Sequence, residues 1–228
     1  MIFNSLTSGT SVEGNEITAF KTDDNATKYL YLMAGTHGDE VEGVYVLDQL
    51  FKWLKEEHSL NDLPIVVIPI LNPDGYRAGT RVNSHAVDLN RNCPTENWSS
   101  EFKKDKYNPG PGPLSEPENV FLDNLFKKLP PALIISFHSW KPILNYNGDA
   151  EDVANYLASY NEYPTCSDIG YPTPGSLGTY AVEKYQAPVL TFECPVLGGE
   201  ISLKSIWEEN EQGLKSFIQS ELLLKKLS

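Results

Sequence analysis

Short apolar runs alternate with amphipathic stretches along most of the chain. The runs at 29–34, 65–71, 133–137 and 189–192 are short and apolar, which is typical of buried strands. In the stretch 40–57, apolar residues recur about every 3.6 residues, which predicts a helix. Further helices are expected at 115–129, 149–161 and 201–224. This alternation predicts an α/β fold with a mainly parallel sheet.

The segments between these elements carry turn and capping signals. Asn72-Pro73-Asp74-Gly75 predicts a turn after the second strand. The stretch 76–114 is rich in Asn, Pro and Gly, and long loops of this kind are usually functional or disordered. Ser115 and Glu118 have the spacing of a capping box. No internal repeat or linker interrupts the chain, so we expect a single domain covering residues 1–228.

Polar residues follow the expected strands. Each of the four expected strands is followed closely by one such residue: His37, Asn72, His138 and Glu193. In open parallel sheets the ligand crevice lies beyond the carboxyl ends of the strands. We therefore expect these four segments to meet at one rim of the sheet.

Composition excludes some classes of function. The net charge of −13 opposes binding to a phosphate backbone, and no apolar run reaches the length of about 20 residues that crosses a bilayer. Three cysteines are too few for a disulfide framework, and each is expected to be a small buried apolar residue. The N-terminus shows no secretory signal, so we expect a cytoplasmic protein that binds neither nucleic acid nor membrane.

The histidines suggest a metal site. His37-Gly38-Asp39-Glu40 places an imidazole and a carboxylate at a strand-to-helix turn, where both can reach one ion. His138 supplies a third ligand, and two histidines with one glutamate form a known catalytic zinc shell. The alternative for His138 is a core histidine satisfied by hydrogen bonds. His58 and His85 lie in polar segments and are expected to be solvated.

Hydrolysis at such a metal needs two further groups. Glu193 is the candidate that accepts a proton from water and passes it to the leaving amine, and the alternative for it is a solvated loop charge. A fixed positive charge must stabilise the developing oxyanion. Arg81 is suitable, and Arg77 is its competitor.

As an ordered set, these residues resemble the zinc carboxypeptidase family, also called funnelins. The motifs that carry the resemblance are His37-x-x-Glu40, Asn72-Pro73-Asp74-Gly75, Arg81, Asp88-Leu89-Asn90-Arg91-Asn92, Ser136-Phe137-His138, Tyr171 and Glu193. The family implies a three-layer α/β/α sandwich around a mixed, mainly parallel sheet. It also implies one zinc ion per chain, held by His37, Glu40 and His138.

The resemblance also implies a role for each remaining motif. Glu193 would be the general base and then the general acid, and Arg81 would stabilise the oxyanion. Asn90 and Arg91 would hold the free carboxylate of the substrate, for which a planar guanidinium is well suited. Tyr171 would close over the substrate, with Tyr180 as the alternative.

Within the family, the chain is most similar to amidases that cleave the γ-D-glutamyl–meso-diaminopimelate bond of murein peptides. Asp39 replaces the arginine that digestive carboxypeptidases carry between two of the zinc ligands, and we expect it to meet a substrate ammonium group. The alternatives are a deacylase of N-acyl amino acids, similar to aspartoacylase or succinylglutamate desuccinylase, a conventional metallocarboxypeptidase, and an inactive binding module. A serine hydrolase is disfavoured, because no Gly-x-Ser-x-Gly motif is present.

Overall fold

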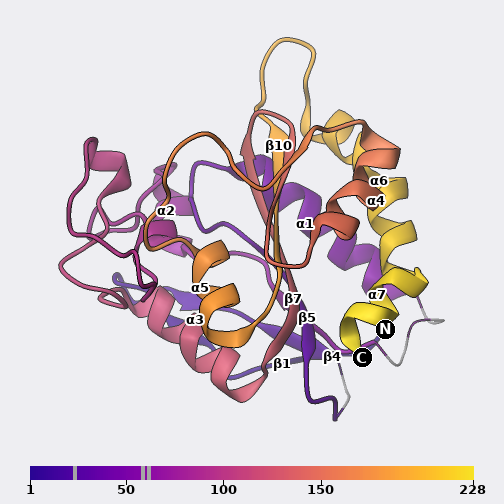
Figure 1. Cartoon of the computed structure of the whole chain (residues 1–228), viewed down its shortest axis with the longest axis horizontal. Helices are drawn as coiled ribbons and strands as arrows, with labels where there is room; N and C mark the ends of the chain where they lie inside the picture. The colour runs from indigo at the N-terminus through magenta and orange to yellow at the C-terminus, as the bar shows by residue number, and fades with distance from the viewer. Residues whose placement is uncertain (23–24, 58–59, 61–62) are drawn as a thin grey trace.

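A mixed eight-stranded sheet runs through the protein in the order β1-β4-β6-β5-β7-β10-β8-β9 (Figure 1). This computed structural model describes residues 1–22, 25–57, 60 and 63–228, so His58 lies outside the described residues. The strands are β1 (Phe3–Ser5), β4 (Phe20–Thr22), β5 (Tyr29–Ala34), β6 (Ile65–Ile68), β7 (Pro131–Trp140), β8 (Ile143–Asn147), β9 (Thr165–Cys166) and β10 (Val189–Pro195). The central strands β6, β5, β7 and β10 are parallel, and antiparallel pairs flank them. A small hairpin of β2 (Gly9–Thr10) and β3 (Glu16–Ile17) lies apart from this sheet.

Helices cover both faces of the sheet, which confirms the expected three layers (Figure 1). One core is formed with α1 (Val41–Glu56), α4 (Glu151–Asn161), α6 (Leu203–Ile218) and α7 (Glu221–Leu227). The other core is formed with α3 (Pro117–Lys128) and α5 (Leu177–Tyr185). Successive side chains of β5 point to opposite faces, so Leu32 joins the first core and Tyr31 the second. No helix in the described ranges has both the length and the apolar character needed to span a membrane.

Several local predictions were wrong. Asn72-Pro73-Asp74-Gly75 does not form an isolated turn but begins α2 (Pro73–Ala78), because the Asn72 side chain accepts a hydrogen bond from Gly75 N and proline suits the first helical position. The capping box is also absent. Helix α3 begins after Glu116, and the Glu118 carboxylate is buried against Asn83 and Val12. The last expected helix is divided at Ser220, which caps α7.

Two of the strands, β7 and β10, are longer than expected. His138 lies within β7, and Glu193 lies within β10. The two residues are direct partners in the parallel register of these strands. Their side chains therefore leave the sheet beside each other, which places a histidine and a carboxylate in one region.

Glycine allows α1 to pack closely on this part of the sheet. A Cβ on Gly43 would lie 2.8 Å from the carbonyl carbon of Phe137, the residue before His138. A Cβ on Gly38 would lie 1.9 Å from the carbonyl carbon of Gly75 at the start of α2. Larger side chains at these two positions would push the 37–40 turn away from β7 and α2.

Candidate active site

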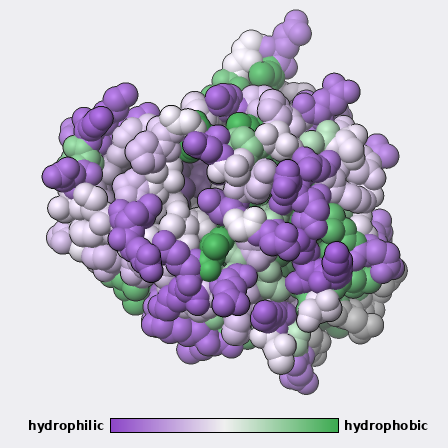
Figure 2. Space-filling model, viewed as in Figure 1, coloured by the Kyte–Doolittle hydropathy of each residue, from purple (hydrophilic) through white to green (hydrophobic). Residues whose placement is uncertain are grey.

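One cavity of about 520 Å³ opens at the carboxyl ends of the central strands, and the surface around it is mostly hydrophilic (Figure 2). All nine residues expected at the site line it: His37, Asp39, Glu40, Arg81, Asn90, Arg91, His138, Tyr171 and Glu193. The expected meeting of the four segments at one rim is confirmed, since Asn72 N donates to the Gly35 carbonyl at 2.8 Å beside the His37 turn. Asn72 itself is fully buried, caps α2 and does not line the cavity.

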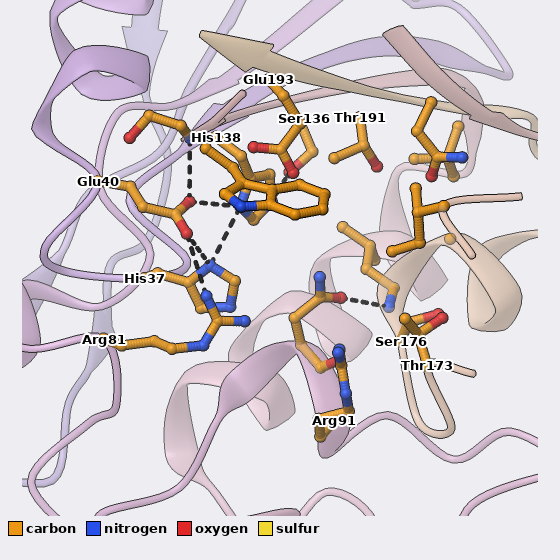
Figure 3. Close-up of a pocket in the computed structure, with 18 of the residues that line it drawn as sticks. His37, Glu40, Arg81, Arg91, Ser136, His138, Thr173, Ser176, Thr191 and Glu193 are labelled. Atoms are coloured by element: carbon orange, nitrogen blue, oxygen red, sulfur yellow. Dashed lines mark hydrogen bonds and ion pairs between the residues drawn. The ribbon is translucent and has the colours of Figure 1, made fainter. Parts of the chain in front are cut away.

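His37, Glu40 and His138 converge at the base of the cavity (Figure 3). His37 Nδ1 lies 2.7 Å from Glu40 Oε1, and His138 Nδ1 lies 2.7 Å from Glu40 Oε2. The two Nδ1 atoms are 3.2 Å apart. One ligand atom from each residue falls within a group spanning 4.8 Å, so the three can bind the same ion.

The second nitrogen of each imidazole has a partner that fixes the ring. His37 Nε2 donates to Asp88 Oδ1 at 3.0 Å, and His138 Nε2 lies 3.0 Å from Ser136 Oγ. With Nε2 as the donor in both rings, both Nδ1 lone pairs face the point of convergence. Carboxylate and hydroxyl partners of this kind orient metal-binding histidines. The residues therefore fit a zinc ion by donor type and by direction.

Electrostatics also favours a cation at this point. Burial raises the pKa of Glu40, but His37 and His138 outweigh this effect and hold the pKa well below its usual range. Burial lowers the pKa of His37, but the carboxylates of Glu40 and Asp88 raise it overall, to about 9. In the metal-free protein the His37 ring therefore carries a second proton near neutral pH, and a metal must displace this proton from Nδ1 to bind.

Arg81 lies beside the metal ligands and is held by two carboxylates. Its Nε and Nη2 donate to Asp88 Oδ2 at 3.1 and 3.0 Å, and its Nη1 donates to Glu40 Oε1 at 3.2 Å. A guanidinium has five N–H groups, so three are used here and two remain. The competitor Arg77 is exposed and donates to Asn15, and it does not line the cavity.

Glu193 has the environment of a proton-transfer group. Its Oε2 is buried and has no hydrogen-bond partner among the residues that the structure describes. Burial raises its pKa, and the nearby Glu40 adds to this effect, while His138 opposes it. A carboxylate with a raised pKa accepts a proton more readily than an ordinary carboxylate, which suits a group that transfers protons.

The substrate-binding residues expected from the resemblance surround the other side of the cavity. Asn90 Oδ1 accepts from Leu177 N at 2.9 Å, which connects the metal-site loop to α5. Arg91 donates from Nη1 to the Asn90 carbonyl at 2.6 Å, and its guanidinium lies 5.5 Å from the centroid of the Tyr107 ring. No other hydrogen bond of the Arg91 guanidinium is found within the part of the chain that the structure describes, so its remaining donors are available to an anion in the cavity.

The structure separates the two candidate tyrosines. Tyr171 is 41% exposed at the mouth of the cavity, with its ring 6.2 Å from that of Trp140. Tyr180 is 2% exposed and donates its hydroxyl to Asp123 in the second core. Of these two tyrosines, Tyr171 is the one that lines the cavity.

Several residues of the site have no distinguishing signal in the sequence. Asp88 and Ser136 belong to motifs of the resemblance, but these motifs assign no role to them. Lys106 and Tyr107 also line the cavity. They lie in the irregular stretch after residue 76, where neither periodicity nor spacing indicates which residues face inward.

Comparisons with known proteins agree with this geometry. The sequence matches the zinc carboxypeptidase family over residues 2–221. It is 31% identical over 208 residues to murein peptide amidase A of Vibrio campbellii, covering 86% of this chain and 81% of the relative. It is 32% identical over 163 residues to murein peptide amidase A of Escherichia coli, covering 67% of this chain and 65% of the relative. The crystal structure of a murein-tripeptide amidase from Escherichia coli superposes with a TM-score of 0.76 at 28% identity, covering 93% of this chain and 90% of that one.

The chain belongs to the zinc carboxypeptidase family. It is a zinc-dependent metallopeptidase, and the cluster of His37, Glu40 and His138 fits the zinc that this family uses.

Proposed function

We propose that this protein is a murein peptide amidase that hydrolyses the γ-D-glutamyl–meso-diaminopimelate bond. The observation that carries the proposal is that every residue expected for this reaction lines one cavity. The similarity to murein peptide amidases over 86% of the chain supports the choice of substrate. In this proposal residues 1–228 act as one catalytic domain.

The residues of the cavity divide the chemistry among them. Zinc, when bound to His37, Glu40 and His138, supplies a Lewis acid that makes water more acidic and polarises a carbonyl. Glu193 accepts the proton of the attacking water on its unpaired Oε2 and then delivers it to the leaving amine. The two free N–H groups of Arg81 donate to the oxyanion that develops on the scissile carbonyl oxygen.

The substrate is held at both ends of its leaving group. Asn90 and Arg91 bind the carboxylate next to the scissile bond. Asp39 is exposed on the cavity wall, where its carboxylate attracts the distal ammonium group of diaminopimelate. Asp39→Asn is expected to abolish the preference for diaminopimelate over an analogue without that ammonium group, and an unchanged preference would remove Asp39 from the recognition of substrate.

We also infer that the reaction belongs to peptidoglycan recycling in the cytoplasm. The three cysteine thiols are free, which fits a reducing compartment. Burial raises the pKa of Cys93 to about 12, so this thiol is an inert part of the core, as expected from the sequence.

The test is incubation of the zinc-loaded protein with L-Ala-γ-D-Glu-meso-diaminopimelate, followed by mass spectrometry of the products. We expect free diaminopimelate from the parent protein and none from Glu193→Gln with the same zinc content. N-acetylaspartate, N-succinylglutamate and benzoylglycyl-phenylalanine serve as parallel substrates. Cleavage of one of these in place of the tripeptide would overturn the proposal in favour of a deacylase or a conventional carboxypeptidase.

A further inference from the structure

Three cationic side chains surround the ring of Tyr107. The guanidinium carbons of Arg81 and Arg91 each lie 5.5 Å from the ring centroid, and the ammonium nitrogen of Lys106 lies 5.1 Å from it. All four residues line the cavity. An aromatic ring attracts cations at these distances, so Tyr107 holds three like charges in one region of the cavity wall.

These three cations differ in how far they are neutralised. Arg81 is paired with Glu40 and Asp88. The guanidinium of Arg91 donates to a backbone carbonyl, and the family resemblance assigns it to one carboxylate of the substrate. Lys106 takes part in none of the ion pairs found among the described residues, so its charge faces the cavity without a protein counterion.

The proposed substrate has more carboxylates than Arg91 can bind. A γ-linked D-glutamate keeps its own α-carboxylate free on the acyl side of the scissile bond. Diaminopimelate has a carboxylate beside the scissile bond and a second one at its far end. Conventional peptide substrates have neither of the additional groups at these positions, so a further cation would select for murein peptides.

We propose that Lys106, positioned by Tyr107, binds a second carboxylate of the substrate. This inference rests on the proposed function and names the substrate class more narrowly, as a γ-D-glutamyl peptide with at least two carboxylates near the scissile bond. Lys106 acts in binding and takes no part in proton transfer. Its removal therefore raises KM and leaves kcat unchanged.

The experiment measures kcat and KM of the zinc-loaded protein with three peptides. These are L-Ala-γ-D-Glu-meso-diaminopimelate, its analogue with D-isoglutamine, which replaces the α-carboxylate with a carboxamide, and its analogue with L-lysine, which lacks the distal carboxylate. The variants are Lys106→Gln, Lys106→Arg and Lys104→Gln. Lys104 is the matched control, because it is an exposed lysine in the same segment that does not line the cavity.

We expect Lys106→Gln to raise KM for the first peptide about three- to tenfold, which is typical of a partly exposed ionic contact. Lys106→Arg should restore KM, and Lys104→Gln should leave it unchanged. The KM of Lys106→Gln should stay at the parent value for whichever analogue lacks the carboxylate that Lys106 binds, and this identifies the carboxylate.

An unchanged KM in Lys106→Gln, or an equal rise for all three peptides, would overturn the assignment of Lys106 while the proposed function stands. Failure of the parent protein to cleave the first peptide would overturn the proposed function and this inference together. The two failures are therefore distinguishable.

Discussion

Asp88 connects the zinc site to Arg81, for which we propose stabilisation of the oxyanion, and its replacement by asparagine tests this connection. The side chain is fully buried. Its Oδ1 accepts from His37 Nε2 at 3.0 Å and from Asn90 N at 2.9 Å, while its Oδ2 accepts from Arg81 Nε and Nη2 at 3.1 and 3.0 Å. Asp88→Asn preserves the shape and the bonds to Oδ1, but it turns an amide donor toward the two donors of Arg81.

The expected loss follows from these contacts. Removing the carboxylate partner of a metal-binding histidine costs about 10- to 100-fold in metal affinity, which corresponds to about 1.4–2.8 kcal/mol. Arg81 also loses the anchor that directs its guanidinium, so we expect kcat to fall about 100-fold even when zinc is saturating. Each hydrogen bond to a charged group contributes about 1.5–3 kcal/mol, so the free energy of unfolding should fall by about 3 kcal/mol.

A matched control separates the site from general destabilisation. Asp74 is also buried, and it accepts hydrogen bonds from Ser11, Asn15 and the backbone of Glu13, outside the cavity. Asp74→Asn should lower stability by a comparable amount and leave the zinc affinity unchanged. Zinc affinity is measured by competition with a chromogenic chelator, and stability by urea unfolding. Zinc binding by Asp88→Asn as tight as in the parent would refute this role of Asp88, and so would an equal loss of zinc affinity in Asp74→Asn.

Three further outcomes are expected. Arg81→Lys keeps the charge but loses the two-pronged geometry, so kcat should fall about 100-fold with little change in KM; equal kcat values would contradict its role. Burial lowers the pKa of His37, but two neighbouring carboxylates raise it overall, to about 9, so a proton on this ring competes with zinc. Chelator competition should therefore show a zinc affinity that rises with pH up to about 9 and then becomes constant. Tyr171→Phe should raise KM without changing the unfolding midpoint. Tyr180→Phe should cost about 1 kcal/mol of stability, because its hydrogen bond to Asp123 is lost, and it should leave KM unchanged. The reverse pattern would make Tyr180 the residue that covers the substrate.

The central strands and the ligand triad could be predicted because each has a strong local signal. The strand at 29–34 is a continuous apolar run buried on both faces, and its observed bounds match the prediction. His37 and Glu40 are close in sequence, so a single turn brings them together. His138 and Glu193 could be placed because parallel neighbouring strands end at the same rim.

The edges of the sheet and the loop contacts lack such signals. Strands β1 and β4 are three residues each, which is too short for periodicity to show, and their pairing depends on distant neighbours. The predicted capping box failed because Glu118 has the right spacing but is bonded to Asn83, which is 35 residues away. Contacts over this separation are decided by tertiary packing, so spacing alone gives the wrong partner.

The site also divides between two kinds of scaffold. Strands β7 and β10 and the turn before α1 hold the metal ligands and Glu193, whereas the irregular stretch 81–107 supplies Arg81, Arg91 and Lys106. That stretch contains only short 3₁₀ segments, at Leu89–Arg91 and Asp105–Tyr107. Contacts other than regular secondary structure must therefore hold this stretch rigid, so that the side chains of Arg81, Arg91 and Lys106 keep their positions.

Buried asparagine side chains provide that rigidity. Asn92 is fully buried, and its Nδ2 lies 2.8–2.9 Å from the carbonyl oxygens of Pro109 and Gly112 and from Ser115 Oγ, which share its two N–H donors. Asn119 of α3 donates to the Leu89 carbonyl at 2.8 Å, which fixes the loop to a helix. Exposed side chains on a loop fixed in this way, such as Lys106, can change without disturbing the zinc ligands on the strands. Substrate preference can therefore vary in this loop while the hydrolytic chemistry stays the same.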